Sequence, residues 1–354
     1  MAVKFIKPEI NVSEKLAELD KPSGIAGEAM LRAETPREQQ ELIGAGRKNL
    51  IINGDFRVSQ RGDYTSATSA VHNQLYLDRW AVRLTNVTAN ILHILGTNSA
   101  PGYPYKDSNS LRLTATNSAT GVMRHLQRVE GFLSGRTLTV SAWVKSNSPN
   151  ARLFSYQHNG GYRESSKPHS GNGGWEYLTL TTVNDANSAN QLYFDIALAT
   201  ETFTNIAITS GEYVEISEVQ MEVGNVATPF EYRLYGEELA LCQRYYQVLA
   251  NISSDSLGAC SRWSSSYIFL FADLPVEMRS VPTLDTNIST STAALATKMA
   301  GYTSTHNNLT IDGDSSPRKI RLNSTSVPSG SSDGQAGWMR LNQGSIYVNL
   351  SAEL

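Results

Sequence analysis

Apolar and polar residues alternate with a period of two along the middle of the chain, the pattern of β-strands that bury one face. The clearest case is 137–145, where every second residue is apolar: Leu138, Val140, Ala142 and Val144. By the same criterion, strands are predicted at 49–58, 76–84, 89–95, 110–116, 121–129, 137–145, 151–157, 175–183, 191–198, 204–209 and 213–223. About ten strands in so short a segment predict a mainly β fold, an antiparallel jelly-roll sandwich over 49–233.

Residues 1–48 have a different pattern, in which apolar residues fall at helical spacing between Glu, Ala and Lys. Thr35, Pro36 and Glu38 form the best helix start, a capping box with proline at the first helical position. Three short helices are predicted, too short to be stable alone. This helical arm either packs on its own sandwich or docks the protein to a larger particle, in which case its contact residues would be Leu16, Leu19, Ile25, Met30, Leu31 and Leu42.

The segment 234–250 reads as a connecting helix with Leu241, Tyr245 and Val248 on one face. That face would be buried between two β domains or would form a seam between chains. Apolar runs at 267–272, 320–322 and 345–350 then predict a second small β domain over 251–354.

Charge and composition exclude several classes of function. The net charge of -3 provides no basic surface for nucleic acid. No apolar run is long enough for a transmembrane helix, and the first residues do not have the pattern of a signal peptide, so we expect assembly in a cytoplasm and no membrane insertion. The two cysteines, Cys242 and Cys260, are expected to be free, buried thiols.

Three motifs bracket the predicted sandwich. They are Asn-Leu-Ile-Ile-Asn-Gly-Asp-Phe at 49–56, Ala-Thr-Pro-Phe-Glu-Tyr-Arg at 227–233, and Glu-Glu-Leu-Ala-Leu-Cys-Gln-Arg-Tyr-Tyr at 237–246, read as a first strand, a last strand and an exit helix. With Tyr-Leu-Asp-Arg-Trp at 76–80, this ordered set resembles tail-fibre and other virion structural proteins of tailed bacteriophages that carry a galactose-binding-like, carbohydrate-binding jelly roll.

The resemblance implies a virion protein, most simply a tail fibre or tail appendage that docks through its N-terminal arm and contributes to attachment to host-surface glycans. It also implies a homotrimer, made in the host cytoplasm, whose partners are a tail adaptor or fibre, or alternatively the capsid. A head fibre, a capsid decoration protein or a tail-fibre joint is the alternative, and a polysaccharide-degrading enzyme is a second one.

Catalytic chemistry has no support in the motifs. A glycosidase needs two carboxylates placed across a cleft, and no pair stands out among Glu164, Glu176, Asp185, Asp195 and Glu201. The histidines are scattered, so no zinc site, cofactor or catalytic residue is assigned and a non-enzymatic protein is expected. Jelly rolls of the resembled family sometimes hold one structural calcium, for which Asn53, Asp55, Glu218 and Glu222 are the positions to inspect.

Sugar recognition is the one ligand hypothesis with a physical basis, because sugar rings stack on aromatic side chains and sugar hydroxyls pair with polar groups. The candidate residues lie around the glycine-rich loop 159–174: Tyr156, His158, Tyr162, Arg163 and Trp175. The alternative is that these aromatic residues only pack the loop and its flanking strands. Trp80 and Trp143 lie inside predicted strands and are expected in the core.

Overall fold

The computed structural model describes residues 48–96, 109–130, 135–157, 163–183, 192–291 and 293–353. The chain divides into two units, 1–48 and 49–354. The predicted helical arm and its six apolar residues, from Leu16 to Leu42, lie outside the described residues, so they stay predictions.

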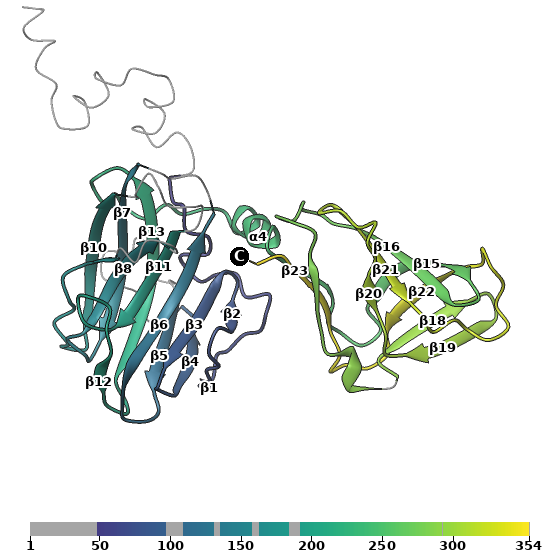
Figure 1. Cartoon of the computed structure of the whole chain (residues 1–354), viewed down its shortest axis with the longest axis horizontal. Helices are drawn as coiled ribbons and strands as arrows, with labels where there is room; N and C mark the ends of the chain where they lie inside the picture. Colours follow the sequence, from purple (N-terminus) through teal and green to yellow (C-terminus); the bar gives the residue numbers. More distant parts are fainter. Residues whose placement is uncertain are drawn as a thin grey trace, which may run out of the picture. The chain divides into compact units, whose positions relative to one another are not determined.

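The first half of the described chain is a sandwich of two antiparallel sheets (Figure 1). The first sheet has the order β1 (Thr68–Ser69), β4 (Ala89–Ile94), β5 (Ser110–Ala115), β13 (Tyr213–Val223), β7 (Thr137–Ser146), β10 (Trp175–Val183). The second has the order β2 (Leu75–Leu77), β3 (Trp80–Thr85), β6 (Ala119–Val129), β11 (Leu192–Leu198), β8 (Ala151–Gln157), β9 (Arg163–Ser165), with β12 (Ile206–Ile208) also paired to β6. The predicted mainly β, antiparallel sandwich is confirmed.

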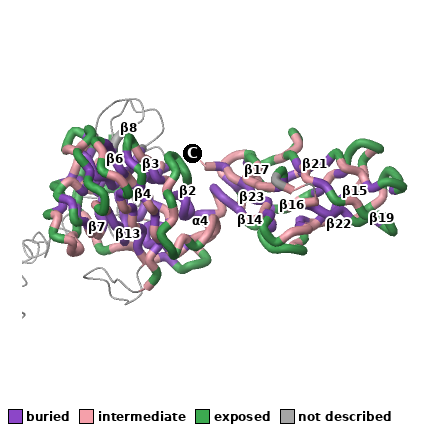
Figure 2. The backbone as a smooth tube through the Cα atoms, turned by 90° about the horizontal axis from the view of Figure 1, so that it is seen from below, coloured by how far each residue is buried: buried purple, intermediate pink, exposed green. Residues whose placement is uncertain are grey.

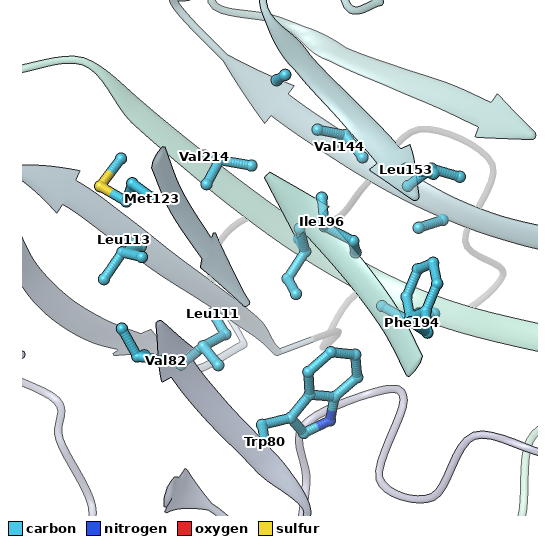
Figure 3. Close-up of a cluster of buried hydrophobic side chains, with 14 of the residues drawn as sticks. Trp80, Val82, Leu111, Leu113, Met123, Val144, Leu153, Phe194, Ile196 and Val214 are labelled. Atoms are coloured by element: carbon cyan, nitrogen blue, oxygen red, sulfur yellow. The ribbon is translucent and has the colours of Figure 1, made fainter. Parts of the chain in front are cut away.

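The core lies between these sheets, as the period-two pattern predicted. Leu138, Val140, Ala142 and Val144 of β7 are fully buried, and Trp80 of β3 with Phe194 and Ile196 of β11, all from the second sheet, belong to the same buried cluster (Figure 3). The indole N–H of Trp80 donates to the carbonyl of Asn53 at 2.8 Å, which satisfies its one polar atom.

Two of the predicted core and strand positions are wrong. Trp143 lies on the outer face of β7, half-buried against the ring of Tyr177 at 5.2 Å, because it alternates with the buried Ala142 and Val144. The segment 49–58 is not a strand. Its Asn53 and Phe56 have φ angles of 58°, outside the β region. Its backbone bonds to β13 at Leu50 and Gly54, while side chains bind it at Ile52 and Asn53, so no regular ladder forms.

The connecting helix is shorter than predicted. Helix α4 covers only Tyr235–Gln243, and Tyr246–Ala250 forms strand β14, which pairs with β23 (Val348–Ser351). The run Tyr-Tyr-Gln-Val-Leu-Ala contains residues that favour strands as well as an apolar spacing compatible with a helix. Pairing with a segment a hundred residues downstream decides the outcome.

The rest of the described chain is also β. Strand β17 (Thr283–Thr286) joins β14 and β23 in a three-stranded sheet, and a 3-10 helix follows at Ile288–Thr290. A seven-stranded sheet, here called the distal sheet, has the order β19 (Tyr302–His306), β18 (Leu295–Met299), β22 (Ala336–Leu341), β15 (Ser256–Ser264), β16 (Tyr267–Asp273), β21 (Lys319–Ser324), β20 (Thr310–Ile311). These strands have a hydrophobic core of their own.

Buried residues run through the strands of both regions, whereas exposed residues gather in the loops (Figure 2). Cys242 and Cys260 are buried and free, as predicted. No helix among the described residues is both long and apolar enough to cross a membrane.

Candidate functional site

The outward surface of the second sheet carries rows of charged and aromatic side chains. Cross-strand register places Arg83 of β3 opposite Arg124 of β6, and Ala197 of β11 opposite both Arg124 and Arg152 of β8. Residues directly opposite each other in an antiparallel pair point to the same face. Three arginines therefore lie in one row across the sheet.

A parallel row contains Arg128 of β6 and Tyr193 of β11, which are also register partners. The Tyr193 ring is buried, and the guanidinium carbons of Arg128 and Arg83 lie 5.3 Å and 5.9 Å from its centre. Leu126 and Ala81 pack against this tyrosine and form the apolar floor between the rows. We call the surface formed by Arg83, Arg124, Arg128, Arg152 and Tyr193 the arginine face.

Arg124 is held in place on two sides. Its Nη1 donates to Oδ2 of Asp195 at 2.5 Å, and the Asp195 side chain is fully buried. The guanidinium also lies 4.8 Å from the centre of the Phe203 ring, which packs edge-on against Phe154. A guanidinium fixed in this way needs little further ordering to bind a ligand.

The electrostatics of this face differ from those of the chain as a whole. Among the side chains that the structure describes here, four arginines stand against one carboxylate, Asp195, while the whole chain has a net charge of -3. Guanidinium groups bind carboxylates and phosphates through paired hydrogen bonds. The arrangement suits an anionic group.

A small cavity of 110 Å³ opens at the β2 side of this face. It is lined by Asn73, Leu75, Arg79, Ala81, Arg83, Leu126, Arg128 and Glu353. The Glu353 carboxylate pairs with Arg79 and, at 2.9 Å, with Arg61. This volume holds a few water molecules or one substituent of a sugar, since one water occupies about 30 Å³ of liquid.

The structure places the backbones of two of the five predicted sugar-binding residues in strands of this sheet and puts a third in the other sheet. Tyr156 is the register partner of Tyr193, and Arg163 is the register partner of Tyr156, so both backbones continue the row of Arg128. Trp175 begins β10 in the other sheet, where it pairs with Lys145. His158 and Tyr162 lie outside the described residues.

The arginines of the face were missed from the sequence. The signal was present in β6, where Val122, Arg124, Leu126 and Arg128 occupy one set of alternate positions and Met123, His125, Gln127 and Val129 occupy the other. Alternation alone does not tell which set faces the core. No aromatic residue lies within the set that carries the arginines, so nothing in it indicated a sugar site.

The carboxylates considered for catalysis do not form a pair across a cleft among the residues that the structure describes. Asp195 is bound to Arg124, and Glu176 accepts hydrogen bonds from Ser170 in the other half of the sandwich. Those bonds lower the pKa of Glu176. Glu201 is exposed in a turn, Glu164 lies in β9, and Asp185 falls outside the described residues.

Two of the four positions proposed for calcium, Asp55 and Glu218, are buried and interact electrostatically. Burial, followed by the charge of Asp55, raises the pKa of Glu218 to about 7, and burial also raises the pKa of Asp55. Each has one buried carboxylate oxygen without a hydrogen-bond partner among the described residues. Such oxygens are calcium ligands by type.

The other two positions are already engaged. The Asn53 side chain binds both the N–H and the carbonyl of Val58, and Glu222 accepts from Thr228 and Gln220. Within the described segments no group of three or more His, Cys, Asp or Glu side chains could hold a metal ion. Of the four positions, Asp55 and Glu218 are the two that could contribute carboxylate oxygens to a cation.

Comparison with solved structures finds neighbours of low sequence identity and low structural similarity. No protein-family model matches the chain, and no curated protein matches it. Among solved structures, the enzymatically active domain of tailspike protein 4 of bacteriophage CBA120 is 13% identical with a TM-score of 0.34, covering 50% of this chain and 21% of that one.

Carbohydrate-binding modules are also among these neighbours. TmCBM61 in complex with β-1,4-galactotriose is 12% identical with a TM-score of 0.31, covering 50% of this chain and 99% of that one. The family 11 module of Clostridium thermocellum is 14% identical with a TM-score of 0.27, covering 46% and 100%. At such values the likeness carries no argument about function, which must come from the site itself.

Proposed function

We propose that this protein is a non-enzymatic structural component of a bacteriophage particle that attaches to acidic polysaccharide through the arginine face of its sandwich. The observation that carries the proposal is the pair of parallel rows, Arg83 with Arg124 and Arg152, and Arg128 with Tyr193, on the outward surface of one sheet.

The chemistry of the face matches a charged sugar better than a neutral one. A uronic acid or phosphorylated sugar offers an anion to the guanidinium groups, whose paired donors match its two oxygens. Tyr193 and Leu126 are buried beneath the guanidinium groups of Arg128 and Arg83, so they support these arginines and leave the charged groups as the binding surface. Asp195 fixes Arg124 and leaves the face with excess positive charge.

The place in a virion rests on the sequence resemblance, with the motifs at 49–56, 227–233 and 237–246 as its support. In this proposal residues 1–48 dock the protein to a tail adaptor or fibre, and three copies assemble in the host cytoplasm. Repetition of the site strengthens attachment, because once one site has bound, binding at the other sites becomes intramolecular.

Binding of purified full-length protein to polygalacturonate, with neutral dextran as the comparison, tests the glycan proposal. Arg128→Ala and Arg83→Ala should each weaken binding by about tenfold or more, since a charge-assisted bond contributes about 1.5–3 kcal/mol. Arg136→Ala, an exposed arginine outside the face, removes the same charge as a control. Equal loss in the control, or binding to neither polymer, would overturn the proposal.

Two further outcomes separate the alternatives. Release of reducing sugar from polygalacturonate during the binding assay would contradict a non-enzymatic role. Antibody labelling of the intact particle by electron microscopy should mark the tail, whereas label on the head would favour the decoration or head-fibre role.

A further inference from the structure

The distal sheet carries a group of exposed aromatic side chains that the proposed function does not use. Trp263 of β15 is 71% exposed and Phe271 of β16 is 64% exposed. Between them lies Phe269, whose ring is tilted by 50° to that of Trp263 with the centres 5.8 Å apart. Exposed side chains of this size, gathered on one sheet, mark interaction surfaces.

The rings enclose a hollow rather than a flat patch. Its volume is 540 Å³, and its lining is Ser261, Trp263, Phe269, Phe271, Asp314 and Arg321. The register of β15, β16 and β21 explains the grouping: Ser261 is opposite Phe269, and Phe271 is opposite Arg321. The volume falls within the usual range of small-ligand sites, about 300–1,000 Å³.

Hydrogen bonds within the protein hold the charged groups at the edge of the hollow in place before any ligand binds. The Nε of Arg321 donates to Asp312 at 2.8 Å, its Nη2 donates to Asp314 at 2.5 Å, and Asn323 donates to Asp312 at 3.2 Å. The guanidinium carbon of Arg321 lies 4.7 Å from the centre of the Phe269 ring. Nη1 of Arg321 and Oδ1 of Asp314 make no hydrogen bond to any residue that the structure describes, which leaves one donor and one acceptor at the edge.

We propose that this hollow is a second saccharide site, specific for a neutral sugar that rests its ring on Trp263 and Phe271 and pairs adjacent hydroxyls with Arg321 and Asp314. It is independent of the arginine face. Arg321 carries one positive charge beside the two negative charges of Asp312 and Asp314, so the site offers hydrogen bonds without attracting an anion.

Contact between copies of the chain is the competing use of such a surface. The centre of a dry protein interface is depleted of charged groups. Here the Asp314 side chain, 76% exposed, stands at the hollow itself and would lose its water when another sheet covered it. A hydroxyl-rich sugar replaces that water with hydrogen bonds, and this difference favours the saccharide.

The test is a titration of full-length protein with neutral oligosaccharides of glucose, galactose, mannose or N-acetylglucosamine. Calorimetry and tryptophan emission measure the binding. One of these sugars should bind, and Trp263→Ala and Phe271→Ala should each weaken it by about tenfold or more. Both side chains are mostly exposed, so the melting temperature should stay unchanged in either variant.

Trp338→Ala is the matched control. Trp338 lies on β22 of the same sheet and is 39% exposed, but Lys298 and Arg340 lie 5.4 Å from its ring, and it does not line the hollow. Its truncation should leave the sugar affinity unchanged. Asp314→Asn should weaken binding while preserving the aromatic walls.

Three results would overturn this inference: binding of none of the neutral sugars, binding that persists in both Trp263→Ala and Phe271→Ala, or dissociation of an oligomer by both variants in sedimentation, which would make the hollow a contact between copies. Loss of polygalacturonate binding in Arg128→Ala with neutral-sugar binding intact would show that the two sites are separate. Failure of one site therefore leaves the test of the other unaffected.

Discussion

Arg233 donates hydrogen bonds to the main-chain carbonyls of Asn49 and, at 3.1 Å, of Ile51, which precede it by more than 180 residues. Its guanidinium also lies 3.3 Å from the Glu238 carboxylate at the start of α4, and Glu238 accepts from the N–H of Asn53. The motifs that bracket the sandwich in sequence are thus joined in space by one buried polar network. Arg233 has a side chain only 4% exposed.

Replacing Arg233 with methionine should destabilise the sandwich by about 3–5 kcal/mol, because Glu238 is left as a buried carboxylate without its partner. The free energy of unfolding, measured by urea denaturation, gives the comparison. Arg244→Met is the control, since the Arg244–Glu130 pair is partly exposed, at 43% and 35%, and should change stability by about 1 kcal/mol or less. Similar losses in the two variants would show that the network is not a major contributor.

Sequence patterns predicted the strands well and the segments outside them poorly. Strands at 137–145, 175–183 and 213–223 agree with β7, β10 and β13, because strict alternation with turn residues at both ends leaves little ambiguity. The segment 49–58 is equally apolar, but the side chain of Gln127 binds its backbone at Ile52, and the backbone of β13 binds it at Leu50 and Gly54. These contacts come from residues distant in sequence, so the segment itself gives no sign of them.

The candidate site was only partly predictable for a related reason. The aromatic and basic residues around 156–175 were found because they are close in sequence, and of these Tyr156 and Arg163 join the row of Tyr193. The arginine face gathers one residue or two from each of several strands. Its members become neighbours only through the order β3-β6-β11-β8, which the sequence does not reveal.

Gly54 should not tolerate a side chain. A Cβ atom at this position would lie 2.1 Å from the carbonyl oxygen of Val219 in β13, and that strand also donates from Val219 N–H to the Gly54 carbonyl at 2.9 Å. Backbone would have to move, so Gly54→Ala should cost about 1–3 kcal/mol of stability or more.

Gly236→Ala is the opposite case and serves as the control for Gly54. Nothing lies within 4 Å of a Cβ atom there, and the residue is in α4, so alanine should stabilise the protein by up to about 1 kcal/mol. Thermal unfolding of the two variants should therefore shift in opposite directions. A shift of the same sign in both would contradict the close approach of Gly54 to β13.

Salt should separate the two proposed binding surfaces. Affinity for polygalacturonate at the arginine face should fall as sodium chloride rises, since the Debye length shortens from about 10 Å at 0.1 M to about 3 Å at 1 M. Affinity for a neutral sugar at the hollow of Trp263 and Phe271 should change little. Calorimetry across a salt series measures both, and a neutral-sugar affinity that falls as steeply as the acidic one would assign the two ligands to one charged site.

The buried pair Asp55 and Glu218 should make the protein less stable as pH rises from about 4.5 to about 7. An unfolded glutamate has an ordinary pKa of 4.5, whereas burial and the nearby Asp55 raise the pKa of Glu218 in the folded protein to about 7. Between those values the folded state holds more protons than the unfolded state, so stability falls with increasing pH and the loss is complete above about pH 7. The full shift corresponds to about 3 kcal/mol at most.

Glu218→Gln removes this titration, so the variant should lose less stability between pH 5 and pH 8 than the parent. Urea unfolding at each pH measures the free energy of unfolding of both proteins. Calcium chloride added at pH 8 should raise the stability of the parent and not of Glu218→Gln if the two carboxylates bind the ion, and a chelator should reverse the effect. Equal calcium responses in parent and variant would place any bound calcium elsewhere. If the parent has the same stability at both pH values, Glu218 is ionised in the folded protein despite the nearby charge of Asp55.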